Sequence, residues 1–247
     1  MRRAGRLVYD VLDSVARQAV PGVTTGALNA GAERMISDAG ATPLFKGVVN
    51  NQASFPFPAA LCISVNDEVV HGVPGERLLC DGDIVSLDCG VRLNGYCGDS
   101  ARTVAVGTAA PDVLRLLEVT EATLSLAIRE IRAGRMWSEV ALQMQRLVEA
   151  AGFSVVRDFV GHGIGQDMHE DPKVPNYCDR KQLRSDFRLQ KGMTLAIEPM
   201  VTMGSHAVEY TGPGRWTVVT RDGKYAAHFE HTVVVTETGS EVLTAGG

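Results

Sequence analysis

The chain has 247 residues, enough to bury a substantial core, and 45% of them are hydrophobic, as in ordinary globular proteins. Its 24 basic and 29 acidic residues give a formal net charge of −5 without a long block of either sign, which argues against a nucleic-acid or anionic-membrane surface. The five cysteines form no C-x-x-C pair, so we expect a reducing cytoplasm and no disulfide framework.

Four segments have the apolar periodicity of helices. The first precedes Pro21, and the second runs from Thr24 or Thr25 to Gly40. The third runs from about Asp112 to Arg132 and the fourth from Ser138 to Ala151. Charged residues interrupt the first apolar run, so it does not resemble a signal peptide, and no segment reaches the roughly 18 apolar residues of a membrane span.

Strand patterns lie on both sides of the third and fourth helices. Before them come PAALCISVN (58–66) and the run 83–106, which reads as a hairpin turning at Leu93-Asn94-Gly95. After them come FSVVRDFVGHGIG (153–165), a polar loop from about Asp171 to Gln190, and the strands MTLAIEPMV, WTVVT, HFEHTVVVTE and EVLTA. This order predicts an α+β fold with an antiparallel sheet.

Four carboxylates lie within or beside these strands. Asp88 and Asp99 are about equally far from the Asn94-Gly95 turn, so their side chains can converge on one face of the hairpin. Asp88 and Glu198 lie in apolar runs, where an unpaired buried carboxylate costs several kcal/mol. A cation should therefore neutralise the group.

A metal site is the reading that explains these carboxylates together. Each acidic residue taken alone fits an exposed or salt-bridged strand position. As a set, Asp88, Asp99, Glu198 and Glu230 with His162 offer oxygen ligands and one imidazole, suited to manganese, iron, cobalt or zinc. Bridging carboxylates favour two ions about 3.5–4 Å apart.

The histidines in GHGIGQDMHE (161–170) do not fit the helical His-Glu-x-x-His zinc signature. His162 could also be a ring that satisfies local backbone groups, and His169 a loop histidine beside Glu170. Cys89 and Cys97 read as small buried strand residues, because the neighbouring donors are hard oxygens.

Five motifs together resemble those of the type I methionine aminopeptidases. They are CISVNDEVVHGVP (62–74), DIVSLDCGVRLNGYCGDSARTV (83–104), GHGIGQDMHEDP (161–172), GMTLAIEPMV (192–201) and FEHTVVVTE (229–237). The resemblance spans nearly the whole chain. It implies one catalytic domain over residues 1–247 with the pita-bread fold, a pseudo-two-fold antiparallel sheet with helices covering one face.

The resemblance also implies two divalent metal ions, manganese, cobalt, iron or zinc. Asp88 would chelate one ion, His162 and Glu198 the other, and Asp99 and Glu230 would bridge them. A hydroxide bridging the ions would attack the peptide, with Glu198 accepting the proton of the water.

Two further histidines, His71 and His169, resemble catalytic residues that lie outside the metal shell and contact the substrate. By resemblance, an apolar pocket for the methionine side chain includes Phe57, Cys62, Met168 and Trp216, each of which could instead be plain core. The sequence departs from the family at Met168, where an aromatic residue is common, and in SFPFPA (54–59).

The implied function is a hydrolase that removes the N-terminal methionine from nascent proteins and peptides and prefers a small second residue. Its partners would be nascent N-termini near the ribosome, with no nucleic-acid or membrane site, and we expect a cytoplasmic monomer. The chain begins within what resembles the first helical segment of the family, with no zinc-finger extension before it.

Two alternatives remain open at the level of sequence. Proline-specific peptidases share the metal ligands but usually carry a further N-terminal domain, and about forty-five residues precede the pocket loop here. A non-catalytic binding protein could retain the fold, although such relatives typically lose ligands that this sequence keeps.

Overall fold

The computed structural model describes residues 1–246. Four helices and two short 3-10 helices are present: α1 (Arg2–Gln18), α2 (Thr25–Asp38), α3 (Pro111–Glu130), α4 (Trp137–Ala150), η1 (Gln182–Ser185) and η2 (Pro213–Arg215). The strands before α3 are β1 (Thr42–Pro43), β2 (Leu61–Val65), β3 (Glu68–Val70), β4 (Ile84–Leu93) and β5 (Tyr96–Ala105). Those after α4 are β6 (Ser154–Val155), β7 (Gly161–Gly163), β8 (Glu170–Val174), β9 (Thr194–Ile197), β10 (Met200–Thr202), β11 (Val208–Thr211), β12 (Thr217–Thr220), β13 (Ala226–His228), β14 (Glu230–Val235) and β15 (Ser240–Val242).

A nine-stranded antiparallel sheet forms the centre of the protein. Its main path is β1-β4-β5-β14-β9-β7-β8, with β2 paired to β4 and β15 paired to β14. The hairpin of β4 and β5 turns at Asn94 and Gly95, whose φ values are 52° and 81°. Both lie in the left-handed region that the tight type I′ hairpin turn requires, so the hairpin predicted from Asn-Gly is confirmed.

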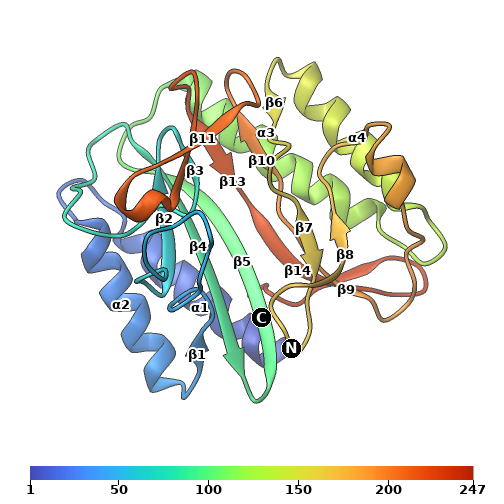
Figure 1. The fold of residues 1–247 in the computed structure, drawn as a ribbon, viewed down its shortest axis with the longest axis horizontal. Coiled ribbons are helices and arrows are strands. Elements are labelled where there is room, and N and C mark those ends of the chain that lie inside the picture. Colours follow the sequence, from blue (N-terminus) through green and yellow to red (C-terminus); the bar gives the residue numbers. More distant parts are fainter. Residues whose placement is uncertain (247) are drawn as a thin grey trace.

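The four helices cover one face of this sheet (Figure 1). α1 and α2 pack on β2, β4 and β5 around one apolar cluster, while α3 and α4 pack on β9 and β14 around another. Each half therefore supplies two helices and part of the sheet, and the expected α+β fold with helices on one face is confirmed. The bounds predicted for α2, α3 and α4 agree with the observed ones to within about two residues, and α1 ends before Pro21 as predicted.

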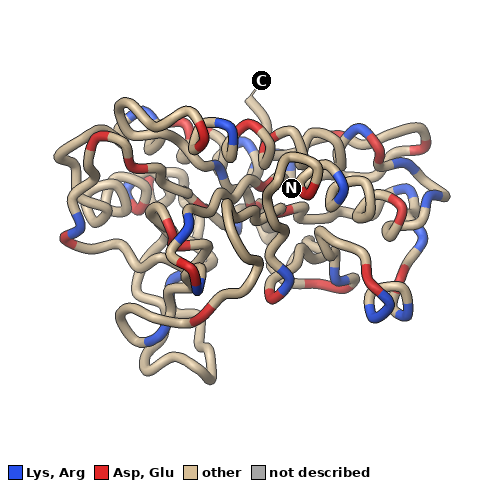
Figure 2. The backbone as a smooth tube through the Cα atoms, turned by 90° about the horizontal axis from the view of Figure 1, so that it is seen from above, with Lys and Arg blue, Asp and Glu red and all other residues tan. Residues whose placement is uncertain are grey.

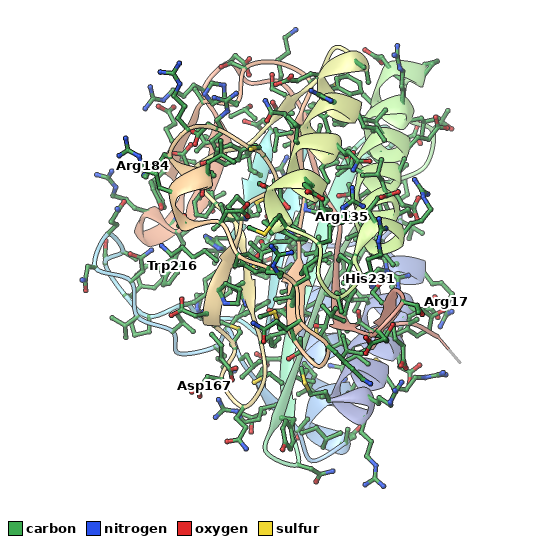
Figure 3. All side chains as sticks on the ribbon, turned by 90° about the vertical axis from the view of Figure 1, so that its right-hand side faces the viewer. Arg17, Arg135, Asp167, Arg184, Trp216 and His231 are labelled. Carbon is green, nitrogen blue, oxygen red and sulfur yellow. The ribbon has the colours of Figure 1, made fainter. Side chains whose placement is uncertain are left out.

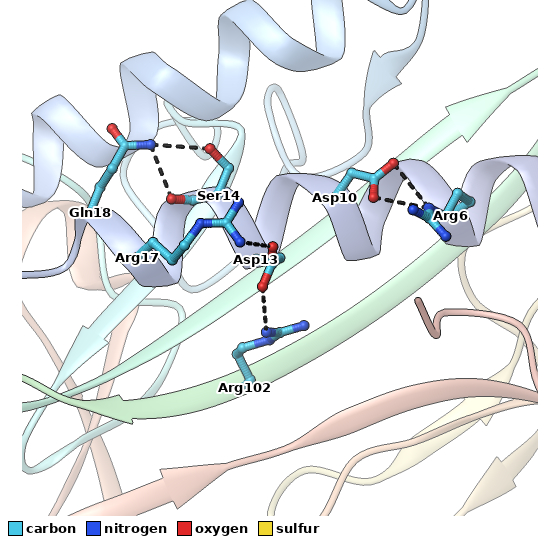
Figure 4. Close-up of polar contacts among 7 residues, drawn as sticks. All are labelled: Arg6, Asp10, Asp13, Ser14, Arg17, Gln18 and Arg102. Carbon is cyan, nitrogen blue, oxygen red and sulfur yellow. Dashed lines mark hydrogen bonds and ion pairs between the residues drawn. The ribbon is translucent and has the colours of Figure 1, made fainter. Parts of the chain in front are cut away.

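Charged side chains form ion pairs along α1 and between α1 and the sheet. Arg6 pairs with Asp10 one turn later, and Asp13 contacts both Arg17 and Arg102 of β5 (Figure 4). The pairing with Arg102 links the helix to the sheet. Across the whole chain, basic and acidic positions are interspersed (Figure 2), which agrees with the absence of charge blocks in the sequence. No helix within residues 1–246 could cross a membrane.

Three strand predictions need correction because the chain changes sheets. FSVVRDFVGHGIG forms the short β6 of a small sheet and, after residues 156–160, β7 of the large sheet. The run MTLAIEPMV is divided at Glu198-Pro199 into β9 of the large sheet and β10 of the small sheet β13-β10-β6. HFEHTVVVTE is divided at Phe229 into β13 and β14 in the same way. Pro199 has no N–H to donate and so favours an interruption of the ladder. Glu198 and Glu230 thus lie at two of these crossings.

The predicted polar loop from about Asp171 begins too early. Residues 170–174 form β8, which pairs with β7 at the edge of the large sheet. The sequence of β8 is charged and lacks the alternating apolar pattern of a strand, since only Val174 of the five residues is fully buried. β8 places the segment that precedes it, with His169, against β7.

A close approach between α1 and β5 generates a stability prediction. A Cβ built on Gly98 would lie 2.7 Å from the backbone nitrogen of Gly5, too close for any carbon. Because backbone atoms cannot rotate away, Gly98→Ala should destabilise the protein by about 1–3 kcal/mol. Urea unfolding followed by circular dichroism measures the change.

Gly75→Ala is the matched control, because a Cβ there meets no atom within 4 Å and the residue does not have a positive φ. Equal unfolding midpoints for the two variants would show that the α1–β5 contact does not require glycine.

Candidate active site

A cavity of about 940 Å³ is lined by Asp88, whose strand neighbours Leu87 and Cys89 pack with α1 and α2. Since successive side chains point to opposite faces of a sheet, the cavity opens on the face opposite these helices. Figure 3 shows the two sides edge-on, with Trp216 of the cavity wall and His231 on opposite sides of the strands. The cavity is lined by all eleven residues that the sequence singled out as ligands, catalytic groups or pocket wall: Phe57, Cys62, His71, Asp88, Asp99, His162, Met168, His169, Glu198, Trp216 and Glu230.

The hairpin register places Asp88 and Asp99 on the same face. Asp88 pairs with Ala101 and Asp99 with Gly90, so the two carboxylates lie diagonally opposite one another, two pairs apart. Residues opposite each other in a pair point to the same side of a sheet. The convergence predicted from the distances to the Asn94-Gly95 turn is therefore confirmed.

Side-chain hydroxyls fix β5 against β14. The N–H of Asp99 donates to Thr232 Oγ1 over 3.0 Å, and the same hydroxyl donates to the carbonyl of Asp99 over 2.7 Å. Ser100 Oγ donates to the carbonyl of Glu230. β5 and β14 pair directly at only two residue pairs. The hydroxyl bonds add to this short ladder and hold the backbones of Asp99 and Glu230 beside each other.

Asp99, His162 and Glu230 offer ligand atoms that all lie within 4.8 Å of one another. Glu198 joins this group, since its Oε1 lies 3.7 Å from His162 Nε2. The donors come from β5, β7, β14 and the end of β9, which are neighbours in the sheet but far apart in sequence. The arrangement brings four of the five predicted ligands together, and Asp88 lines the same cavity.

Burial makes the pKa of each of these carboxyl groups abnormal. Desolvation raises the pKa of Asp99 to about 7. Desolvation, followed by repulsion from neighbouring carboxylates, raises the pKa of Asp88, Glu198 and Glu230 well above the ordinary range. Within residues 1–246, no Lys or Arg forms an ion pair with any of the four carboxylates.

The residues present fit divalent metal ions. Asp88 Oδ1, Asp99 Oδ1 and Glu230 Oε1 are buried oxygens without a hydrogen-bond partner among the described residues. Such atoms are costly unless a cation or donor reaches them. Four carboxylates and an imidazole form a donor set typical of first-row divalent ions.

His162 has the protonation state of a metal ligand. Burial lowers its pKa to about 4, so the ring is neutral at pH 7. Its Nδ1 lies 2.8 Å from the carbonyl of Gly163, and donation there leaves the Nε2 lone pair directed toward Glu198.

His162 lies on β7, and the glycines on either side of it allow this strand to lie close to its two neighbours. A Cβ on Gly161 would lie 2.3 Å from the carbonyl oxygen of Ala196, and one on Gly163 would lie 2.3 Å from that of Asp171. β7 is thus pressed between β8 and β9. His169 follows on the connecting loop, and its ring meets that of His162 edge-on at 4.4 Å between centroids.

His169 and His71 line the cavity outside the carboxylate cluster. Partial burial lowers the pKa of His169. Burial lowers the pKa of His71 to about 4, and its Nδ1 has no partner. His71 has a φ of 60°, a strained backbone conformation that directs its ring edge-on to Phe159 at 5.4 Å.

The apolar part of the cavity contains the four predicted pocket residues. Phe57, Cys62, Trp216 and the partly buried Met168 belong to one hydrophobic cluster, together with Phe45. The rings of Phe57 and Trp216 meet edge-on at 5.1 Å, and Trp216 Nε1 donates to the carbonyl of Phe55 over 2.7 Å. The wall is therefore held in place before any ligand binds.

Sequence reasoning missed other residues at the cavity. Phe45, Phe159 and residues 48–52 also line it, and His228 lies behind Glu198. Phe159 lies only three residues before His162, so its closeness in sequence could have placed it near the cavity. Residues 48–52 have no strand or helix pattern from which their position could be predicted.

Comparison with known proteins identifies the family. A model of metallopeptidase family M24 matches residues 1–237. Methionine aminopeptidase 1 of Bacillus subtilis is 48% identical over 244 residues, which cover 99% of this chain and 94% of the relative. The chain belongs to the methionine aminopeptidases of metallopeptidase family M24.

Solved structures confirm the pita-bread fold. The methionine aminopeptidase of Thermotoga maritima has a TM-score of 0.92 and 41% identity, and the match covers 100% of this chain and 95% of that one. The Xaa-Pro dipeptidase of Bacillus anthracis shares the fold with a TM-score of 0.77 at 22% identity, but this chain covers only 59% of it. The similarity therefore favours the methionine aminopeptidases over the proline-specific branch.

The raised carboxyl pKa values predict how the metal-free protein responds to pH. A group whose pKa is raised by folding binds more protons in the folded state, so the free energy of unfolding falls as pH rises. From about pH 5 to 7, the slope should reach about 1.4 kcal/mol per pH unit for each such group. Urea unfolding of metal-stripped protein at several pH values measures it.

Asp88→Asn removes one of these groups and leaves the five histidines whose pKa is lowered by burial, which act with the opposite sign below about pH 6.5. Its slope should be shallower by about 1.4 kcal/mol per pH unit. Parallel curves for wild type and Asp88→Asn would contradict the assignment of raised pKa values to the carboxylate cluster.

Proposed function

We propose that this protein is a metalloaminopeptidase that removes the N-terminal methionine from nascent proteins and peptides. The observation that carries the proposal is that one cavity contains both a carboxylate cluster and an apolar pocket. Carboxylates with three buried oxygens that lack a partner line the same cavity as a preformed apolar pocket and two histidines, His71 and His169. The relatives named methionine aminopeptidase, similar over nearly the whole chain, support this function.

The proposed site holds two divalent ions, manganese, cobalt, iron or zinc. Asp88 would hold one ion, His162 and Glu198 would hold the other, and Asp99 and Glu230 would be shared between the two. When bound, such ions lower the pKa of water and polarise a carbonyl. The donor set and the three oxygens without partners support this assignment.

Protein groups perform the remaining steps. Glu198 accepts the proton of the attacking water, because its carboxylate lines the cavity beside His162. His169 donates a hydrogen bond to the oxygen that becomes negative as the carbonyl is attacked. His71 contacts the amide nitrogen or the backbone beyond the cleaved bond.

The proposed substrate is an unblocked N-terminus with an unbranched apolar side chain. Phe57, Cys62, Met168 and Trp216 receive the methionine, and the open cavity toward residues 48–52 admits the following chain. A small second residue suits the approach to the metal centre. We further propose that residues 1–247 form one catalytic domain that acts as a cytoplasmic monomer on N-termini emerging near the ribosome.

Peptide cleavage tests the function. Metal-stripped protein receives manganese, cobalt, iron or zinc in turn, and release of methionine from Met-Gly-Met-Met is followed by chromatography. We expect metal-dependent release from this peptide, little from a Met-Lys peptide, and none from Gly-Pro-Ala. Cleavage of Gly-Pro-Ala would favour a proline-specific peptidase, and metal binding without any cleavage would favour a binding protein.

Two variants distinguish the proposed role of Asp99 as a metal ligand from that of His169 as a catalytic histidine. Asp99→Asn should abolish turnover and lose bound metal, because Asp99 is a bridging ligand. His169→Ala should reduce kcat by about 10²-fold or more while metal content stays near that of wild type. Metal analysis after gel filtration provides the comparison, and equal metal loss in both variants would refute the division.

Met168→Phe tests the pocket. A larger, rigid ring in the same cluster changes the space for the methionine side chain. We expect KM for Met-Gly-Met-Met to change several-fold with kcat within about two-fold, because the substitution alters ground-state and transition-state binding together. Unchanged kinetic constants would remove Met168 from the pocket wall.

A further inference from the structure

His228 is a buried histidine beside the metal centre to which the proposed mechanism assigns no role. It ends β13 and is only 2% exposed, and it does not line the cavity. Its Nε2 lies 3.8 Å from Glu198 Oε2 and has no hydrogen-bond partner among the described residues. A buried ring nitrogen left in this state is costly, so its position requires an explanation.

Glu198 lies between two imidazoles. Its Oε1 is 3.7 Å from His162 Nε2 on the cavity side, and its Oε2 is 3.8 Å from His228 Nε2 on the far side. Within residues 1–246, the carboxylate of Glu198 accepts no hydrogen bond, although Asn176 Nδ2 donates to its backbone carbonyl over 3.0 Å. The backbone of Glu198 is therefore anchored, but the direction of its carboxylate is not.

The backbone of His228 is fixed independently of Glu198. Its N–H donates to Thr103 Oγ1 over 2.8 Å, and that hydroxyl donates to the carbonyl of His228 over 2.9 Å. Ser86 Oγ lies 2.8 Å from Thr103 Oγ1 and donates to it, since the proton of Thr103 is already used. These bonds attach His228 to the β4–β5 hairpin that carries Asp88 and Asp99.

We propose that His228 is a positioning residue whose Nε2–H donates a hydrogen bond to Glu198 Oε2 and directs Oε1 toward the ion that His162 also binds. Closing 3.8 Å to a normal bond of about 2.9 Å needs a shift of roughly 1 Å. His228 thereby connects the Asp88/Asp99 hairpin to the ligand on the opposite half of the sheet. The proposal deepens the proposed function and rests on Glu198 being a metal ligand there.

The expected size of the effect follows from other metal sites. Partners that orient a metal ligand without touching the ion typically contribute about 10–100-fold to metal affinity or activity. A histidine that only filled space would leave both quantities unchanged when replaced by a side chain of similar volume.

Three variants separate these possibilities. His228→Leu keeps bulk and removes the donor, whereas His228→Gln keeps a neutral N–H donor of similar reach. His206→Leu is the control, because His206 is exposed and lies outside the cavity lining. Manganese affinity is measured by competition with a chelator, kcat and KM with Met-Gly-Met-Met, and folding by circular dichroism and urea unfolding.

We expect His228→Leu to lose about 10–100-fold in manganese affinity and in kcat, with KM within about three-fold of wild type. His228→Gln should recover both to within about three-fold, and His206→Leu should match wild type. A folded His228→Leu with wild-type affinity and kcat would overturn the proposal. So would a His228→Gln variant as impaired as the leucine variant, because hydrogen-bond donation would then not be the property that matters.

If His228→Leu does not fold, His228→Asn replaces it. Its amide donor stops one bond short of that of glutamine, so Asn should lose manganese affinity where Gln retains it, and equal affinities would overturn the proposal. Manganese affinity also separates this inference from the proposed function. A wild-type protein that binds manganese but releases no methionine would refute the peptidase, while the comparison of variants would still decide the role of His228.

Discussion

Four carboxylates line one cavity, two of them buried and two partly buried, and no Lys or Arg of residues 1–246 pairs with them. The rest of the structure depends on this constraint. Ionising each carboxyl group is unfavourable, first because burial removes its hydration and second because the neighbouring carboxylates repel it. Such a cluster is stable at neutral pH only if protons or cations neutralise it. The fold therefore builds a site whose charge has to be supplied from outside, which is what a metallopeptidase of family M24 requires.

The sheet holds this unfavourable group in place through backbone and hydroxyl contacts, not through ion pairs. Thr232 links β14 to Asp99, and Ser100 links β5 to Glu230. Glu198 and Glu230 lie where the chain leaves one sheet for another, so these crossings place both carboxylates in the cavity. The helices on the opposite face bury the sheet and leave this side free for substrate.

The local parts of this architecture could be predicted from the sequence. The Asn94-Gly95 turn determines the register of β4 and β5, and the register determines that Asp88 and Asp99 share a face. Helical periodicity located all four helices. The positions of His162, Glu198 and Glu230 in or beside strands suggested that they join this pair, and the five motifs supplied the role of each residue. No spacing rule could supply those roles, because pairing between distant strands brings these residues together.

What sequence reasoning missed has the same physical origin. β8 has an exposed, charged sequence and exists because β7 offers it an edge. His228 lies two residues before Glu230, but β13 belongs to another sheet, so alternation along one strand could not place its ring behind Glu198. Residues 48–52 reach the cavity through a loop, whose course no periodic pattern describes.

The most direct test of the account is the anomalous-difference map of a crystal grown with manganese and recorded near the manganese absorption edge. The account predicts two peaks about 3.5–4 Å apart, with Asp99 and Glu230 between them, Asp88 on one and His162 with Glu198 on the other. A single peak, or peaks bound elsewhere while these five side chains remain unliganded, would contradict the claim that the carboxylate cluster is a two-ion site.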